Sequence, residues 1–271
     1  MNINGHNLRW LEVKPQHPTF KWCGFCPFLL FIMHLLLLHG AIGSAAQLQP
    51  LAEKLSQDFS VATLNFSGHG GNQMGAENYS IELFAEDVLR FMEEQGIKKV
   101  AIFGYSMGGY VALYLAKHYP QKVGQVFTLA TKFNWSPEVA EKEVKMLDPV
   151  AISQKLPRFA EILKNRHSPA NWETVLYKTA QMLQELGRNN VLTKADLNTL
   201  SLPVIFCVGD SDKMVAVEET LAIQRQVKDS GLLVLPLTPH PIEAVDLQLL
   251  VVHLRSFFTQ VSVSEKSLKR Q

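Results

Sequence analysis

A strand-like run of residues at 99–103 is followed at once by the glycine-rich stretch 104–109 and by a helix-like run at 110–117. The stretch contains the pattern Gly-x-Ser-x-Gly, with Ser106 at its centre. A serine on so sharp a turn needs neighbours without a Cβ, which would collide with the backbone. The turn also places the serine at a helix N-terminus, where free backbone N–H groups stabilise negative charge. Ser106 is therefore a candidate nucleophile, and the alternative is a glycine-rich turn that only packs a helix on a sheet.

Further apolar runs alternate with helical patterns, in the order expected of a parallel sheet with helices on both faces. The run at 35–38 is apolar throughout, which is typical of a central parallel strand buried on both sides. The predicted strands are 35–38, 59–64, 99–103, 126–130, 203–208 and 232–237, and the predicted helices around them are 45–57, 81–95, 110–117 and 242–258.

The alternation stops between residues 134 and 200, where only helical patterns occur, at 137–147, 150–165 and 169–186. A helical block between two strands of an α/β sheet is the expected form of a lid. We therefore expect a core of residues 1–133 and 201–258, a helical lid of residues 134–200, and a flexible tail of residues 259–271. Several apolar residues of the lid are expected either to pack it onto the sheet or to line a pocket, among them Trp135, Met146, Phe159, Trp172 and Met182.

Composition limits the classes of partner and cofactor. The 271 residues are 47% hydrophobic and 19% charged with a formal net charge of +1, which suits one soluble domain and offers no electrostatic case for nucleic acid. Cys207 lies in a strand pattern and is expected in the core, whereas Cys23 and Cys26 form a Cys-x-x-Cys pair. Pro27 and an apolar run follow that pair in place of the helix that a redox dithiol needs. No second ligand pair for zinc is evident, so no metal or cofactor is expected.

The apolar run at 25–38 is 14 residues long, too short to span a bilayer comfortably, since about 20 are needed. Basic residues precede the run and small residues follow it, so residues 9–46 are also compatible with a signal segment for export. Cleavage there would remove residues 39–43, which the chemistry considered below requires. We therefore expect a cytoplasmic protein, with export as the alternative.

A serine hydroxyl needs a base to take its proton and a third group to orient that base. Asp210 and Asp212 follow the predicted strand 203–208, and His240 follows the predicted strand 232–237. Both loops lie at the carboxyl ends of strands, where open α/β sheets collect their ligands. The order Ser, Asp, His is thus met, with two candidates for the acid.

Over roughly residues 8–258 the chain resembles the α/β-hydrolase superfamily, and in particular its serine esterase and lipase-like branch with a helical lid. Only the segment 15–33 is unusually long and apolar for that family. The motifs that carry the resemblance are His39-Gly40-x-x-Gly43-Ser44, Ser67-Gly68-His69-Gly70, Gly104-Tyr105-Ser106-Met107-Gly108-Gly109, Gly209-x-x-Asp212 and His240-Pro241.

The resemblance implies an α/β-hydrolase fold and a role for each motif. It makes Ser106 the nucleophile, His240 the general base and acid, and Asp212 the orienting carboxylate. It favours Asp212 over Asp210 because the family usually places the acid three residues after the glycine. The backbone N–H groups of Ala41 and Met107 would form the oxyanion hole, and the residues expected to border the substrate are His39, Gly40 and Tyr105.

The function that this resemblance implies is cofactor-free hydrolysis of a small carboxylic ester or thioester through an acyl-serine intermediate. A C–C bond hydrolase with the same triad and a non-catalytic binding protein of the same fold are the alternatives. The sequence indicates neither the acyl chain nor the oligomeric state.

Overall fold

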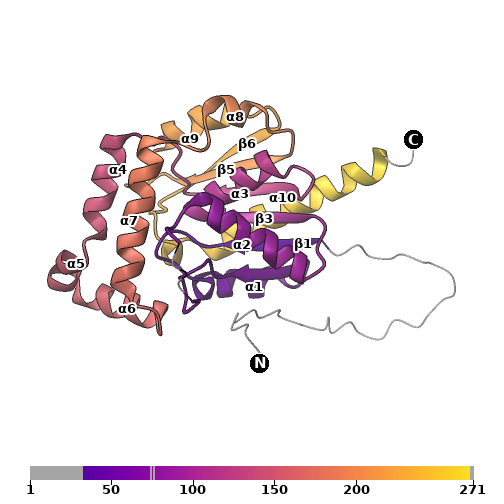
Figure 1. Ribbon diagram of the computed structural model, residues 1–271. Helices are drawn as coiled ribbons and strands as arrows, with labels where there is room; N and C mark the ends of the chain where they lie inside the picture. Colours follow the sequence, from indigo (N-terminus) through magenta and orange to yellow (C-terminus); the bar gives the residue numbers. More distant parts are fainter. Residues whose placement is uncertain (1–32, 74, 76, 269–271) are drawn as a thin grey trace, which may run out of the picture.

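Six parallel strands form the centre of the molecule in the order β2-β1-β3-β4-β5-β6 (Figure 1). The computed structural model describes residues 33–268 except 74 and 76, so Cys23, Cys26 and the segment before residue 33 lie outside the described residues. The strands are β1 (His34–Leu38), β2 (Ser60–Leu64), β3 (Val100–Tyr105), β4 (Val123–Leu129), β5 (Val204–Gly209) and β6 (Ser230–Leu235). All six predicted strands are therefore present.

Successive side chains of β1 enter different apolar cores, because side chains alternate between the faces of a strand. Leu36 and Leu38 pack in one buried cluster, and Leu35 and Leu37 pack in the other. This confirms the prediction that the apolar run is a strand covered on both faces. Cys207 on β5 is buried in the second cluster, as expected for a core residue, and burial raises the pKa of its thiol.

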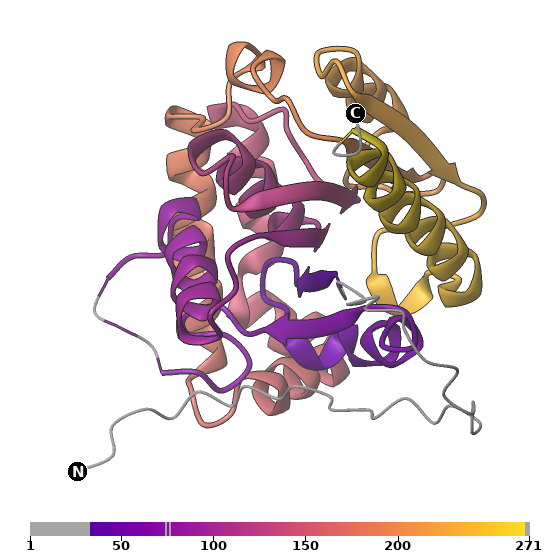
Figure 2. The same cartoon turned by 90° about the vertical axis from the view of Figure 1, so that its right-hand side faces the viewer.

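Helices cover both faces of the sheet. Figure 2 shows α2 (Ile81–Glu94) and α10 (Leu247–Leu268) on opposite sides of it. The first face also carries α3 (Met107–His118) and α9 (Val217–Gln224), and the second also carries α1 (Gln49–Leu55), which follows a short 3-10 helix at Ala45–Leu48. The predicted mostly parallel sheet with helices on both faces is thus confirmed.

The segment between β4 and β5 contains helices and no strand within its described residues 130–203, and we call residues 134–200 the insert. Its α4 (Pro137–Val144) and α7 (Trp172–Arg188) pack side by side, away from the sheet (Figure 1). The insert also contains α5 (Pro149–Lys155), α6 (Pro157–His167), α8 (Lys194–Asn198) and a short 3-10 helix at Lys145–Leu147. One helix was predicted over 150–165, but Pro157 divides that segment because a proline disfavours helical backbone in the residue before it.

The C-terminal region differs from the prediction. A 3-10 helix at Ile242–Ala244 precedes α10, which begins at Leu247 and continues to Leu268. The helix thus extends past its predicted end at residue 258, because neither proline nor glycine ends it there. A flexible tail over residues 259–271 stays a prediction. Helix α9 was not predicted. In the described part of the chain, no helix has the length and apolar character needed to cross a membrane.

Candidate active site

Ser106 joins β3 to α3 at the carboxyl edge of the sheet, with a backbone φ of +51°. A positive φ is uncommon for a residue other than glycine, so the surroundings must hold it. The Ser106 N–H donates to the carbonyl of Leu129 at 2.7 Å, and the Thr131 hydroxyl donates to the Ser106 carbonyl at 3.0 Å. A Cβ on Gly104 would lie 2.4 Å from the Cα of Gly109, so the turn has no room for a side chain there. The end of β4 and the loop after it thus hold the serine turn in place.

His240 and Asp212 are in direct contact, because the His240 Nδ1 donates to the Asp212 Oδ2 at 2.8 Å. The other carboxylate oxygen accepts the N–H groups of Met214 at 2.7 Å and Val215 at 2.9 Å. Burial alone would raise the pKa of Asp212, but the hydrogen bond and charge of His240, with the two backbone donors, outweigh it and lower that pKa. Asp212 is therefore an ionised carboxylate that sets the orientation of the His240 ring and leaves Nε2 available.

The second candidate acid lies elsewhere. Asp210 is exposed, and its carboxylate accepts the hydroxyl of the neighbouring Ser211 at 3.0 Å. The structure therefore brings Asp212, and not Asp210, to the histidine. The choice between them depends on the loop that follows β5, which turns Asp212 inward.

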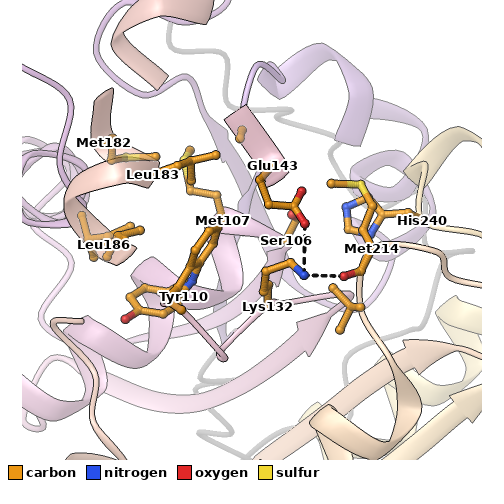
Figure 3. A pocket seen from close by; sticks show the side chains of 14 residues that line it. Ser106, Met107, Tyr110, Lys132, Glu143, Met182, Leu183, Leu186, Met214 and His240 are labelled. Carbon is orange, nitrogen blue, oxygen red and sulfur yellow. Dashed lines mark hydrogen bonds and ion pairs between the residues drawn. The ribbon is translucent and has the colours of Figure 1, made fainter. Parts of the chain in front are cut away.

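Ser106 and His240 line one cavity of about 510 Å³, part of which is open to solvent. No direct hydrogen bond joins the two side chains in this structure; such bonds are often long before substrate binds. Figure 3 shows the α7 side chains across the cavity from His240 and Met214. The lining is mostly apolar and comprises Ala41, Ile81, Ser106, Met107, Tyr110, Lys132, Trp135, Glu143, Met182, Leu183, Leu186, Met214, Val215 and His240.

Ala41 lies in a tight turn after β1, in which the Gly43 N–H donates to the Gly40 carbonyl at 3.1 Å. We call residues 40–43 the oxyanion turn, after the oxyanion hole that the resemblance leads us to expect at Ala41. Within the described part of the chain, neither the Ala41 N–H nor the Met107 N–H donates a hydrogen bond to another residue, and both residues line the cavity. Gly40 packs against the serine turn, where a Cβ would come within 3.1 Å of the Ser106 Cβ. Two unused N–H donors therefore lie beside the serine.

Two residues expected to border the substrate support loops instead. The His39 side chain is fully buried, with Nδ1 donating to the Gly40 carbonyl at 2.8 Å and Nε2 accepting the Phe66 N–H at 3.3 Å. The Tyr105 hydroxyl donates to the His240 carbonyl at 3.0 Å, and its ring is buried. Neither side chain lines the cavity, because each is turned inward from the loop it stabilises.

His167, at the end of α6, is a second buried histidine beside the oxyanion turn, and sequence reasoning missed it. Its Nε2 donates to the Ile42 carbonyl at 3.0 Å, and its Nδ1 accepts the Gly70 N–H at 3.2 Å. Burial lowers the pKa of His39 to about 3 and that of His167 to about 4. Both rings are therefore neutral, with opposite tautomers, and each pairs one backbone N–H and one carbonyl.

The cavity wall also contains an ion pair that the sequence did not reveal. Lys132 follows β4, and its ammonium group lies 3.2 Å from the Glu143 carboxylate of α4 and 2.5 Å from the Met214 carbonyl (Figure 3). The pair is largely buried and joins the core, the insert and the loop of Asp212. The position of Lys132 so soon after a buried strand was the one feature of the sequence that could have indicated a buried charge here.

The apolar residues of the insert have three different environments. Trp135 and Met182 line the cavity. Phe159 and Trp172 pack against a small core inside the insert, and Met146 is 49% exposed. Among the described residues no group of three or more His, Cys, Asp or Glu is arranged to hold a metal ion.

Comparison with known proteins agrees with this architecture. A family model described as alpha/beta hydrolase fold matches residues 33–151. The chain is 31% identical over 157 residues to a pimeloyl-[acyl-carrier protein] methyl ester esterase of Aliivibrio fischeri, covering 58% of this chain and 54% of that protein. It is 27% identical over 191 residues to a thermostable monoacylglycerol lipase of a Bacillus species, covering 67% and 71%. The match thus spans about half the length of the first relative.

Solved structures show the same fold. A putative lipase from Acinetobacter baumannii superposes with a TM-score of 0.73 at 21% identity, covering 86% of this chain and 85% of that one. A thermophilic esterase from Thermogutta terrifontis gives a TM-score of 0.70 at 23% identity, covering 84% and 90%. The chain thus shares the fold of the α/β hydrolases, and the predicted α/β-hydrolase fold is confirmed.

The buried neutral histidines predict how stability depends on pH. The unfolded chain binds protons at histidine near pH 6.5, whereas folded His39 and His167 do so only near pH 3 and 4. Lowering the pH below 6.5 therefore favours the unfolded state by up to about 1.4 kcal/mol per pH unit for each histidine. Urea unfolding at pH 7 and pH 5 should show this loss. His167→Gln should reduce the slope, exposed His118→Gln should change it little, and equal stability at both pH values would contradict neutral buried histidines.

Proposed function

We propose that this chain is a serine hydrolase of carboxylic esters, with Ser106 as nucleophile, His240 as general base and acid, and Asp212 as the orienting carboxylate. One observation carries the proposal. The strained serine turn opens into the same cavity as a histidine whose far nitrogen is bonded to a buried, ionised carboxylate. The activities that the names of the relatives state, on a methyl ester and on a monoacylglycerol, support the ester class.

In the proposed reaction, the Ser106 Oγ attacks the ester carbonyl carbon while His240 Nε2 takes the hydroxyl proton. Asp212 stabilises the imidazolium ion that forms. The carbonyl oxygen becomes an oxyanion, and the N–H groups of Ala41 and Met107 donate to it. His240 then gives its proton to the leaving alkoxide, which releases the alcohol and leaves an acyl-serine. A water molecule, deprotonated by His240, attacks the acyl carbon, and protonation of Ser106 releases the acid.

The cavity supports an apolar substrate group. Its outer wall belongs to the insert, through Trp135 and the α7 residues Met182, Leu183 and Leu186, and its inner wall includes Ile81 and Tyr110. We infer that the insert acts as a lid whose side chains select the acyl chain. A thioester of similar size would react by the same steps.

Replacing the nucleophile tests the mechanism directly. Ser106→Ala should lower kcat by about 10⁶-fold, because loss of a triad nucleophile has that effect in other serine hydrolases. A fluorophosphonate probe should label the unchanged protein and not this variant. Circular dichroism controls for folding. Substantial ester hydrolysis by folded Ser106→Ala would contradict the mechanism, and a protein that neither hydrolyses esters nor reacts with the probe would be a binding protein.

The two acids offer a matched pair of variants. Asp212→Asn should lower kcat by about 10⁴-fold, because an amide favours the wrong tautomer of His240. Asp210 lies in the same loop and does not contact His240, so the Asp210→Asn protein should retain most activity. Steady-state rates on p-nitrophenyl butyrate decide between them. The reverse order of activities would mean that the acid was assigned wrongly.

A larger side chain on α7 should change the preferred acyl chain. Leu183→Trp narrows the cavity, so kcat/KM for p-nitrophenyl hexanoate should fall while that for the acetate stays nearly constant. Each excluded methylene should count for about 1–3 kcal/mol. Tyr177→Trp, at an exposed position of the same helix, is the control. Equal loss on both esters by folded Leu183→Trp would contradict selection of the acyl chain by the insert.

A further inference from the structure

Ile42 has an unusual conformation for its residue type. It is the third residue of the oxyanion turn and has a φ of +51°. Turns that need a positive φ at this position usually have glycine or asparagine there, because a β-branched side chain is disfavoured. Such a conformation persists only where neighbouring groups hold it. The question is which groups hold Ile42.

The insert contacts both the carbonyl and the side chain of Ile42. Arg166 Nη1 donates to the Ile42 carbonyl at 3.1 Å, and His167 Nε2 donates to it at 3.0 Å. The Ile42 side chain packs against the buried core of the insert, formed by Ile152, Leu163 and Leu176. Two adjacent residues of α6 thus converge on one backbone oxygen of a loop that belongs to the core.

That oxygen is coupled to the Ala41 N–H through two rigid peptide groups. The Ile42 carbonyl shares a peptide group with the Gly43 N–H, which donates to the Gly40 carbonyl at 3.1 Å. The Gly40 carbonyl shares the next rigid group with the Ala41 N–H, and the two point in opposite directions because the peptide is planar and trans. Holding the Ile42 carbonyl therefore sets the direction of the Ala41 N–H.

Arg166 also reaches the loop that follows His240. Its Nη2 lies 3.5 Å from the Glu243 carboxylate, which accepts the Gln47 side-chain amide at 2.6 Å. The side-chain oxygen of Gln47, Oε1, in turn accepts the Ser44 N–H at 2.9 Å. The guanidinium group, with donors in a rigid fork, can hold both acceptors at once. Arg166 therefore links the oxyanion turn to the histidine loop.

We propose that Arg166 and His167 are positioning residues that direct the Ala41 N–H into the cavity, where it stabilises the oxyanion. The inference rests on the proposed function and extends it, because it gives the insert a part in the chemical step. Residues of the insert that line the cavity act on the acyl chain. Arg166 and His167 act on the oxyanion, which every ester forms regardless of chain length.

The test uses p-nitrophenyl acetate, the substrate that depends least on the cavity wall. Arg166→Met and His167→Asn should each lower kcat about 10-fold or more and change KM less than threefold. Removal of a whole oxyanion donor lowers kcat by about 10²–10³-fold, and a donor that is only misdirected should cost less. Phenylboronic acid forms a tetrahedral adduct with an active-site serine and places an oxygen in the oxyanion hole. Its inhibition constant should rise by the same factor as kcat falls.

Matched variants separate positioning from a general structural role. Lys164→Met removes a cation from an exposed position of α6 and should leave both readouts unchanged. His167→Gln places an amide donor near the position of Nε2, so it should retain more activity than His167→Asn, whose shorter amide lies near Nδ1. If Arg166→Met does not fold, Arg166→Lys, which keeps the charge without the fork, decides the question by the same two readouts.

If the unmutated protein hydrolyses the ester, and folded Arg166 and His167 variants have the same kcat and boronate affinity as it does, this inference is overturned. The proposed function would stand in that case. Equal loss in His167→Gln and His167→Asn, with boronate affinity retained, would also overturn it. Failure of the unchanged protein to hydrolyse any ester or to react with a fluorophosphonate would instead contradict the proposed function.

Discussion

The backbone at Ser106 is the constraint on which the rest of this structure depends. A positive φ at a residue with a side chain is stable here because β3 and α3 approach each other through glycine. The end of β4 and the loop after it also bond the N–H and the carbonyl of Ser106. The strand that carries the serine lies between β1 and β4, so the loops after all three meet at one edge. The candidate oxyanion donors and the cavity follow from that arrangement.

Buried neutral histidines and ion pairs both hold the loops around the site. The histidines beneath the oxyanion turn are buried and neutral, so each can accept one backbone N–H and donate to one carbonyl. The Asp212 carboxylate accepts the His240 Nδ1–H, Arg166 is paired with Glu243, and Lys132 is paired with Glu143. A buried ion pair contributes little net stability, but removal of one partner is costly. The Lys132–Glu143 pair therefore joins the insert to the loop that contains Asp212, and loss of either partner should be costly.

The insert contacts the core at more than one point of the proposed site. Its α7 forms the far wall of the cavity, while the end of α6 bonds the oxyanion turn and approaches the loop of His240. Substrate selection and stabilisation of the oxyanion would then depend on neighbouring helices of one segment. A change in how the insert packs would affect both, and the two effects can be separated only with substrates of different length.

The sequence by itself determined the parallel sheet, the serine turn and the order of Ser106, Asp212 and His240, because apolar periodicity, glycine and proline act over short distances along the chain. It could not determine that the side chains of His39 and Tyr105 are turned inward. Only the family pattern favoured Asp212 over Asp210 as the partner of His240. It also missed Lys132, Arg166 and His167. These placements depend on contacts between residues far apart in the chain, such as Tyr105 with His240 at 135 positions and His167 with Ile42 at 125. Such contacts exist only after the loops and the insert have packed on the core, so the tertiary structure alone decided them.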